Sequence, residues 1–219
     1  MEQKLEKMDE FFARRVEGYD EHMLGEVPGC RAAYRKIAQL VPDGCQTLLD
    51  LGCGTGLELE SLYGRFPALC VTGIDMTPQM LERLIEKYRT RTFELICGDY
   101  FEVPFGKARF DAAVSFQTMH HFTADRKLWL YRKIREALKP GGVYVECDYM
   151  VACRKDEEIF FSESRRLRRE QGLAEDAYFH YDTPLTVRHQ MKLFREAGFA
   201  DVRNVYRMEN TTILTGKAG

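Results

Sequence analysis

The glycine-rich segment at residues 48–60 constrains the fold of this chain more than any other part of the sequence. An apolar run leads to Asp50, and Gly52, Gly54 and Gly56 then alternate with other residues before a helix-forming stretch begins. Glycines allow a tight turn and a close approach of the backbone to a ligand, because they carry no Cβ atom. The segment therefore predicts a strand, a turn and a helix that together hold a nucleoside cofactor.

The spacing of these glycines favours a cofactor without a pyrophosphate. A dinucleotide fingerprint has its third glycine where this chain has Leu57, which also disfavours a nicotinamide-dependent oxidoreductase. Asp75 ends a second apolar run, where its carboxylate can accept hydrogen bonds from both ribose hydroxyls. Asp99 follows a third apolar run and can accept a hydrogen bond from an exocyclic adenine amine.

Strand and helix signals alternate through the middle of the chain. Such alternation predicts an α/β fold in which parallel strands are joined by crossover helices on both faces of one sheet. Ligands of these sheets bind outside the carboxyl ends of the strands, where Asp50, Asp75, Asp99 and Ser115 would lie. Strands are expected near 46–51, 69–74, 93–97, 109–115 and 142–148, and helices near 56–65, 77–90 and 125–138.

The flanking segments predict further helices and two more strands. A helix over 1–17 is followed by a turn at 27–29 and a second helix over 30–40. Near the C-terminus, a helix over 186–197 precedes two β-like runs, at 202–206 and 211–215. The expected units are a helical lid at 1–45, a cofactor-binding core at 46–148, a helical cap at 149–185, and a C-terminal helix with the last two strands at 186–219.

Composition argues against nucleic-acid and membrane partners. The 219 residues are 45% hydrophobic, enough for a substantial core, and the net charge of −2 gives no general attraction to nucleic acid or anionic membranes. The charged N-terminus is not a signal peptide, and no apolar run approaches the roughly 18 residues of a membrane span. The seven cysteines include no C-x-x-C pair, which predicts a reducing, cytoplasmic location and no metal site.

Five motifs occur in an order that is typical of one family: the glycine loop, Asp75, Asp99, and the runs at 110–121 and 138–145. Over this region the chain resembles the class I S-adenosylmethionine-dependent methyltransferases of the small-molecule type. The resemblance implies a Rossmann-like, seven-stranded, mostly parallel sheet with helices on both faces and a last antiparallel strand. It also implies S-adenosyl-L-methionine as cofactor, S-adenosylhomocysteine as product, and methyl transfer to O or N of a small-molecule acceptor.

The same resemblance implies roles for the cofactor-binding residues. Asp50 and the glycine turn would hold the methionine end, Asp75 the ribose, and Asp99 the adenine, with Met76 packed on the purine face. Cys53, inside the turn, is interpreted as a small packing residue. Tyr19 lies in a segment that resembles the lid of these enzymes and is expected to reach the site. The expected cofactor-binding residues are Tyr19, Asp50, Gly52, Cys53, Gly54, Gly56, Asp75, Met76, Asp99, Tyr100, Phe116 and Gln117.

His120 and His121 are the expected catalytic residues, because they follow the fourth strand of the core closely. A histidine can accept a proton from a hydroxyl, amine or thiol near neutral pH. The alternative is that one of them packs at a helix start while the other only lines the pocket. His180 lies in an aromatic stretch suited to a pocket wall, and His189 is expected on a helix surface. The resemblance makes the cap at 149–185 the expected source of acceptor specificity.

Two alternative functions stay open. Arg165, Arg166, Arg168 and Arg169 form a basic cluster that would suit an RNA or protein methyltransferase, but acidic neighbours favour a solvated helix with intrahelical ion pairs. The other alternative is a non-catalytic regulator that binds S-adenosylmethionine. The motifs of adenine-amino and cytosine-C5 methyltransferases are missing after the 109–115 strand. The acceptor, the choice between O-, N- and C-methylation, the general base and the oligomeric state are not identified.

Overall fold

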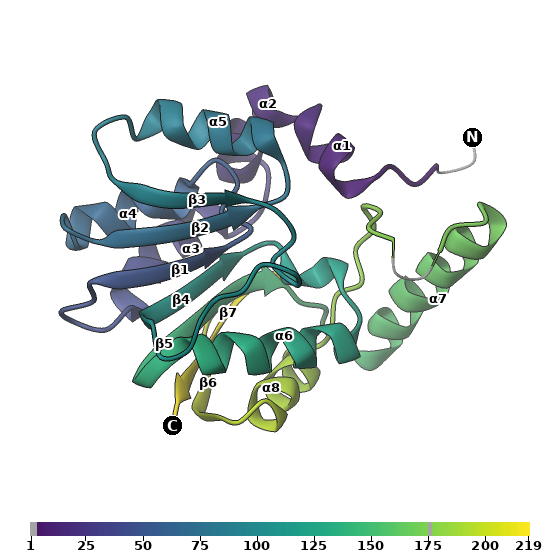
Figure 1. The fold of residues 1–219 in the computed structure, drawn as a ribbon. Coiled ribbons are helices and arrows are strands. Elements are labelled where there is room, and N and C mark those ends of the chain that lie inside the picture. Colours follow the sequence, from purple (N-terminus) through teal and green to yellow (C-terminus); the bar gives the residue numbers. More distant parts are fainter. Residues whose placement is uncertain (1–3, 175–176) are drawn as a thin grey trace.

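The computed structural model describes residues 4–174 and 177–219, and its centre is a seven-stranded sheet (Figure 1). The strands are β1 (Thr47–Leu51), β2 (Cys70–Asp75), β3 (Phe93–Cys97), β4 (Phe110–Phe116), β5 (Leu138–Tyr149), β6 (Phe199–Met208) and β7 (Thr211–Ala218). Their order across the sheet is β3-β2-β1-β4-β5-β7-β6. β7 runs antiparallel to both of its neighbours, whereas the other neighbouring strands are parallel. The Rossmann-like sheet with an antiparallel last strand is therefore confirmed.

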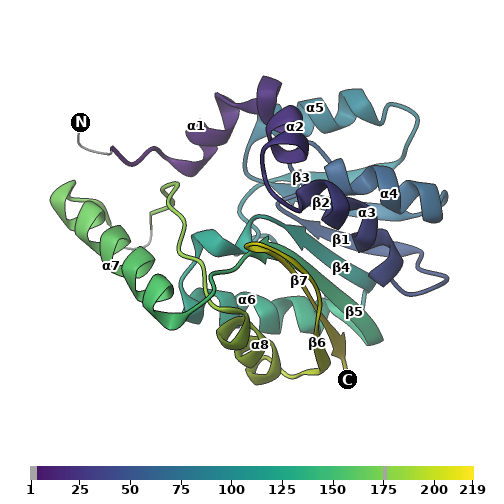
Figure 2. The ribbon, with the colours of Figure 1, turned by 180° about the vertical axis from the view of Figure 1, so that it is seen from behind.

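Helices cover both faces of the sheet, as Figures 1 and 2 show from opposite sides. They are α1 (Met8–Ala13), α2 (Val16–Gly25), α3 (Cys30–Leu40), α4 (Leu57–Arg65), α5 (Pro78–Lys87), the 3₁₀ turn η1 (Met119–His121), α6 (Ala124–Ala137), α7 (Arg154–Glu170) and α8 (Val187–Glu196). Successive residues of a strand point to opposite faces. Leu48 therefore packs in the layer of α3, α4 and α5, and Leu49 packs in the layer of α6 and α8. The two buried layers fix the positions of the strand ends.

The N-terminal segment differs from the expected single helix over 1–17. Two short helices, α1 and α2, are separated at Arg14 and Arg15. Both guanidinium groups form ion pairs with Glu6, at 2.9 and 3.4 Å, which turns the chain back toward residues that precede α1. Residues 1–3 of the expected helix lie outside the described residues. The break directs α1 across the strand ends and lets α2 pack against the sheet layer beside it.

Several strand bounds also differ from expectation. β5 begins at Leu138, four residues before the expected start at 142, because Leu138 pairs with Phe110 ahead of a register shift in the β4–β5 ladder. β6 and β7 are both longer than the β-like runs at 202–206 and 211–215, since they pair with each other over nearly their whole length. Antiparallel pairing extends strands through residues whose own sequence pattern is weak.

The basic cluster lies on α7, the main helix of the expected cap. Arg166 forms ion pairs with Glu163 and Glu170, both at 2.5 Å and both within the helix. Arg168 donates to the carbonyl oxygens of Ala174 and Ala177. These contacts fit a solvated helix with intrahelical ion pairs. Among the described residues, no helix is both long and apolar enough to cross a membrane.

Candidate active site

The glycine loop lies at the carboxyl end of β1. Gly52, Gly54 and Gly56 have positive φ angles of 67°, 47° and 72°, a conformation that residues with a Cβ atom rarely adopt. A Cβ atom at Gly52 would lie 2.7 Å from the Thr118 hydroxyl oxygen, so this position has no room for a side chain. The atoms nearest to a Cβ at Gly54, among them a ring carbon of Tyr19, would lie 4.0 Å away. The loop backbone therefore faces open space at Gly54.

Asp75, the last residue of β2, holds this loop in place. One of its carboxylate oxygens accepts a hydrogen bond from the Gly54 amide at 2.9 Å, and the other accepts from the Thr77 amide at 2.8 Å. Burial raises the pKa of Asp75, although both amide donors oppose the shift. Asp75 borders a small cavity of about 50 Å³. The other expected cofactor residues that line this cavity are Gly52, Met76, Asp99 and Tyr100.

Asp50 of β1 is buried beside a second carboxylate, Glu58, which sequence reasoning missed. Asp50 is 1% exposed and Glu58 4%. Both carboxylate oxygens of Asp50 and one of Glu58 lack a hydrogen-bond partner among the described residues. Burial and then the charge of Glu58 raise the pKa of Asp50, and burial also raises the pKa of Glu58. The pair has unmet capacity to accept hydrogen bonds from a cationic ligand.

Tyr19 comes from α2 and lies beside the glycine loop. Burial raises its pKa far above the ordinary tyrosine value, and the Glu58 carboxylate adds to the shift. The next residue, Asp20, anchors the helix, because it accepts a hydrogen bond from the Thr55 hydroxyl and forms an ion pair with Lys87 at 2.8 Å. α2 is thus tied both to the loop and to α5.

Cys53 and Phe116, two more of the expected cofactor residues, have buried side chains. Cys53 is 2% exposed, and a Cβ atom at Gly73 would lie 2.9 Å from its sulfur, so its side chain packs against β2. Phe116 stacks on Tyr34 with ring centroids 3.7 Å apart, which leaves only its backbone to face a ligand. The next residue, Gln117, has a positive φ of 51° and lines the larger cavity described below.

The lid and the cap meet above Asp99. The Tyr178 hydroxyl donates a hydrogen bond to one Asp99 oxygen at 2.7 Å, and the Phe101 amide donates to the other at 2.8 Å. The Met8 amide donates to the Tyr178 carbonyl at 3.1 Å, and the His180 amide donates to the Glu6 carbonyl at 2.9 Å. Sequence reasoning named His180 in this stretch as a wall residue but gave Tyr178 no contact with Asp99.

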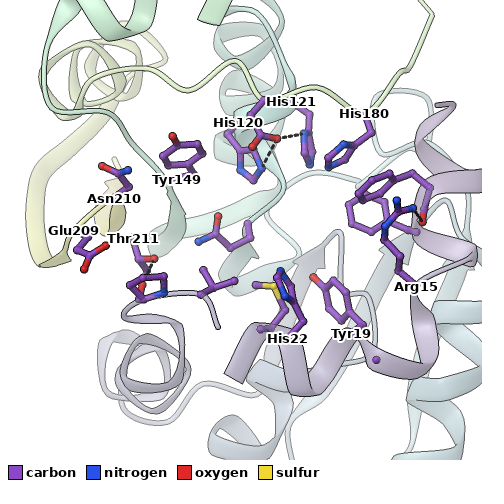
Figure 3. Close-up of a pocket in the computed structure, with 18 of the residues that line it drawn as sticks. Arg15, Tyr19, His22, His120, His121, Tyr149, His180, Glu209, Asn210 and Thr211 are labelled. Carbon is purple, nitrogen blue, oxygen red and sulfur yellow. Dashed lines mark hydrogen bonds and ion pairs between the residues drawn. The ribbon is translucent and has the colours of Figure 1, made fainter. Parts of the chain in front are cut away.

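A larger cavity of about 850 Å³ is lined by Tyr19, whose ring also lies near Gly54, and by His120 and His121 (Figure 3). Figure 3 shows His120, His121 and His180 along one wall, with Tyr19 and His22 across from them. Phe11, Phe12, Met23, Val27, Pro28 and Tyr149 add apolar and aromatic surfaces, and polar side chains such as Gln117, Asp182 and Asn210 lie between them. A cavity of this size and character suits a small organic molecule.

The two adjacent histidines have opposite electrostatic surroundings. His120 Nδ1 lies 2.7 Å from a carboxylate oxygen of Asp148, and its Nε2 lies 3.5 Å from Asp182 Oδ1. Burial lowers the pKa of His120, but the two carboxylates outweigh it and the net shift is upward. For His121, burial and the neighbouring His120 and His180 lower the pKa well below the ordinary value. Both histidines line the larger cavity.

Asp148 belongs to a buried polar network that sequence reasoning missed. Asp148 and Glu146 lie two residues apart on β5 and are both fully buried. Glu146 accepts a hydrogen bond from the Tyr131 hydroxyl at 2.6 Å, and burial, followed by the charge of Asp148, raises its pKa to about 7. Buried Lys127 donates to Gln190 at 3.3 Å. Two carboxylates at alternate positions of a central strand are the signal that could have pointed to this network.

His180 lines the wall of the larger cavity, and His189 connects two helices. The His180 ring stacks on Phe11 with centroids 3.4 Å apart, so it forms part of the cavity wall, as the aromatic stretch predicts. His189 was expected on a helix surface, but that expectation did not include its contact with a neighbouring helix. His189 Nδ1 lies 2.6 Å from the Glu157 carboxylate and joins α8 to α7.

Known proteins resemble this chain in both sequence and fold. A family described as a methyltransferase domain matches residues 48–142. A protein named as an uncharacterized methyltransferase of Geobacillus kaustophilus is 31% identical over 198 residues, which cover 89% of this chain and 86% of the relative. A carboxy-S-adenosyl-L-methionine synthase of Wolinella succinogenes is 27% identical and covers 99% of this chain and 96% of its own. The solved DhpI–SAH complex superposes with a TM-score of 0.70 at 18% identity, covering 96% and 94% of the two chains.

Proposed function

This chain belongs to the class I S-adenosylmethionine-dependent methyltransferases, and we propose that it transfers the methyl group to an oxygen or nitrogen atom of a small-molecule acceptor. The observation that carries the proposal is the cavity of about 850 Å³ that is lined by Tyr19, His120 and His121. Its apolar and aromatic lining supports a small organic acceptor. Arg14 and Arg15, which also border it, are both paired with Glu6, and this opposes a role in binding a nucleic-acid backbone.

The residues at the strand ends fit S-adenosyl-L-methionine. The unpartnered oxygens of Asp50 and Glu58 offer acceptors for the ammonium group of its methionine end. We propose that the amides of the Gly52–Gly56 turn bind its carboxylate, Asp75 its ribose, and Asp99 with the Tyr100 backbone its adenine. When bound, the cofactor supplies a methyl group activated by the sulfonium.

The two histidines are proposed to accept the proton that the acceptor loses. Asp148 binds Nδ1 of His120, an arrangement that fixes the imidazole and leaves Nε2 on the cavity side. A base that is oriented by a buried carboxylate is a recurrent catalytic arrangement. Phe12, Tyr19 and His180 close the cavity from the lid and cap side, which supports exclusion of water during transfer.

An acceptor screen tests this function. The protein is incubated with S-adenosylmethionine and pools of aromatic alcohols, phenols and amines, and mass spectrometry follows both S-adenosylhomocysteine and methylated products. We expect turnover with at least one pool, and a fall of at least about 100-fold in His120→Ala while cofactor affinity is retained. Methylation of only RNA or protein substrates, or cofactor binding without turnover in any pool, would overturn the small-molecule proposal.

A second candidate reaction is modification of the cofactor itself. The similarity to a carboxy-S-adenosyl-L-methionine synthase extends over 99% of this chain, and this supports a further arm of the experiment that also contains a carboxylic acid able to give up its carboxyl group to the cofactor. The mass spectrum distinguishes the two reactions, because a carboxylated sulfonium cofactor has a mass that neither S-adenosylhomocysteine nor a methylated acceptor shares.

A further inference from the structure

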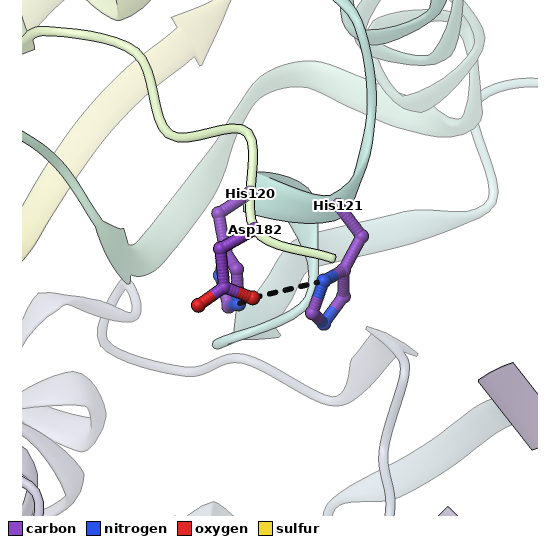
Figure 4. Close-up of side chains that lie close together, drawn as sticks. All are labelled: His120, His121 and Asp182. Atoms are coloured by element: carbon purple, nitrogen blue, oxygen red, sulfur yellow. Dashed lines mark ion pairs between the residues drawn. The ribbon is translucent and has the colours of Figure 1, made fainter. Parts of the chain in front are cut away.

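We propose that His120, His121 and Asp182 form a three-ligand site for a divalent cation of the zinc class, open toward the acceptor cavity. The spacing of histidines and cysteines along the sequence predicts no metal, since two of the ligands are adjacent and the third follows about sixty residues later. Figure 4 shows the Asp182 carboxylate reaching toward both imidazole rings. One ligand atom from each residue lies within 4.8 Å of the other two.

The two distances from Asp182 are longer than a hydrogen bond and fit shared coordination of an ion. Asp182 Oδ1 lies 3.5 Å from His120 Nε2 and 3.5 Å from His121 Nδ1. Hydrogen bonds between such atoms have lengths of about 2.7–3.2 Å. A tetrahedral ion with ligands at about 2.0–2.2 Å separates neighbouring ligand atoms by about 3.4 Å.

Among the described residues, two of the three ligand atoms are also buried without a hydrogen-bond partner. These are His121 Nδ1 and Asp182 Oδ1, and the His121 side chain is only 3% exposed. Leaving polar atoms buried and unpartnered is costly, and a bound cation would meet the capacity of both. The Asp182 side chain is 34% exposed, which leaves a path by which an ion can enter.

The surroundings of His120 match those of a histidine that binds a metal ion. His120 Nδ1 contacts Asp148 at 2.7 Å, so the opposite nitrogen, Nε2, is the one turned toward Asp182. A carboxylate on the second nitrogen is the usual support for a histidine that binds a metal through the first. Three protein ligands that border a cavity leave a fourth position for water or an acceptor oxygen.

Cation binding and the base role of the proposed function compete for the same nitrogen lone pairs. With the ion bound, an acceptor hydroxyl in the fourth position would release its proton to water, because the ion lowers the pKa of the hydroxyl, and no histidine base would be needed. The inference about the acceptor therefore rests on the proposed function, whereas ion binding itself does not. The test measures ion binding without any acceptor, so that failure of one proposal is distinguishable from failure of the other.

Calorimetric titration of the metal-free full chain with Zn²⁺ is the first part of the test. We expect one ion per chain, with affinity reduced at least tenfold in His121→Ala and in Asp182→Asn. His22→Ala is the matched control, since His22 lines the same cavity outside the cluster and should leave the affinity unchanged. Equal loss in the control, or no saturable binding by the folded wild-type chain, would overturn the site.

Replacing Zn²⁺ with Co²⁺ tests whether cysteines bind the ion. The visible spectrum of the loaded protein should show tetrahedral d–d bands without a thiolate charge-transfer band, and the bands should disappear in Asp182→Asn. A thiolate band would assign the ion to surface cysteines such as Cys70, Cys97 or Cys153 and would contradict the proposal. Thermal unfolding with and without Zn²⁺ provides a check on folding, because the ion should raise the melting temperature of the wild type more than that of either ligand variant.

Discussion

Asp75 directs both of its carboxylate oxygens to the backbone of the site, one to Gly54 and one to Thr77. We expect Asp75→Ala to weaken S-adenosylmethionine binding by about 100-fold, because two hydrogen bonds to a charged group are lost together with the proposed ribose contacts. Calorimetric titration measures the effect. Asp111→Ala is the control, since Asp111 accepts bonds from Gln46 and Thr47 at the opposite end of the sheet. Unchanged affinity in Asp75→Ala, or an equal loss in the control, would contradict the assignment.

Glu58 and Asp50 are expected to lower the free energy of unfolding of the ligand-free protein, although they contribute to cofactor binding. Their pKa values are raised in the folded state, so the folded state holds protons more tightly. Stability from this source is present below the ordinary carboxyl pKa and is lost as pH rises toward the raised values. Glu58→Gln should therefore stabilise the ligand-free protein at pH 7.5 by about 1–3 kcal/mol, with a smaller gain at pH 5, and should weaken cofactor binding.

Urea unfolding at both pH values measures the stability change, and calorimetry measures the affinity. Glu60→Gln is the matched control, because Glu60 lies on the same helix but is exposed, and neither quantity should change. A loss of stability in Glu58→Gln at pH 7.5 would show that the Glu58 carboxylate has a partner that it needs in the folded state.

At the scale of elements, we expect the lid over the strand ends to be separable from the core. Residues 4–20 contribute Leu5, Met8 and Tyr19 to the region above the site, whereas the buried layers around β1 and β4 come from other segments. Deletion of residues 1–20 should weaken cofactor affinity without unfolding the sheet. Calorimetry and a thermal melt test both parts, and an affinity equal to that of the full chain would contradict the role of the lid.

Tyr178 on the cap competes with the proposed adenine contact. Its hydroxyl donates to Asp99, the carboxylate proposed to accept from the adenine amine. Tyr178→Phe should raise cofactor affinity by about 2- to 10-fold, because binding then breaks one hydrogen bond fewer. Calorimetry measures the change, with Tyr181→Phe as a control from the same segment. A weaker affinity in Tyr178→Phe would mean that the hydroxyl assists binding instead.

The sequence allowed much of this arrangement to be predicted, and the limits have a physical cause. The helix over 30–40 and the strand over 93–97 were predicted with their observed bounds, because apolar periodicity and turn residues are local signals. The break at Arg14 depends on Glu6, which precedes α1 and lies outside the helical pattern, and the early start of β5 depends on Phe110, which is distant in sequence. Glu58, Asp148 and Tyr178 were missed for the same reason, since a side chain's partners across the fold leave no periodic trace.

At the scale of the whole molecule, the lid and the cap form one connected cover. The Met8 amide binds the Tyr178 carbonyl, the His180 amide binds the Glu6 carbonyl, and the Phe11 ring stacks on His180. Beneath this cover the adenine side of the site has a cavity of about 50 Å³. Such a space holds only one or two water molecules, far less than a nucleoside needs. We therefore expect cofactor entry to move the cover away from Asp99.

Because the two segments are joined, we expect them to respond to the cofactor together. At saturating S-adenosylhomocysteine, hydrogen exchange should change by a similar factor at residues 4–20 and at 177–183, whereas β6, the edge strand of the sheet, follows only global stability. Phe11→Ala removes the stack on His180 and should make the change at one segment smaller than the change at the other. A response confined to one segment of the wild type would mean that lid and cap open independently. In that case the backbone hydrogen bonds between them would be too weak to couple cofactor entry to the acceptor cavity.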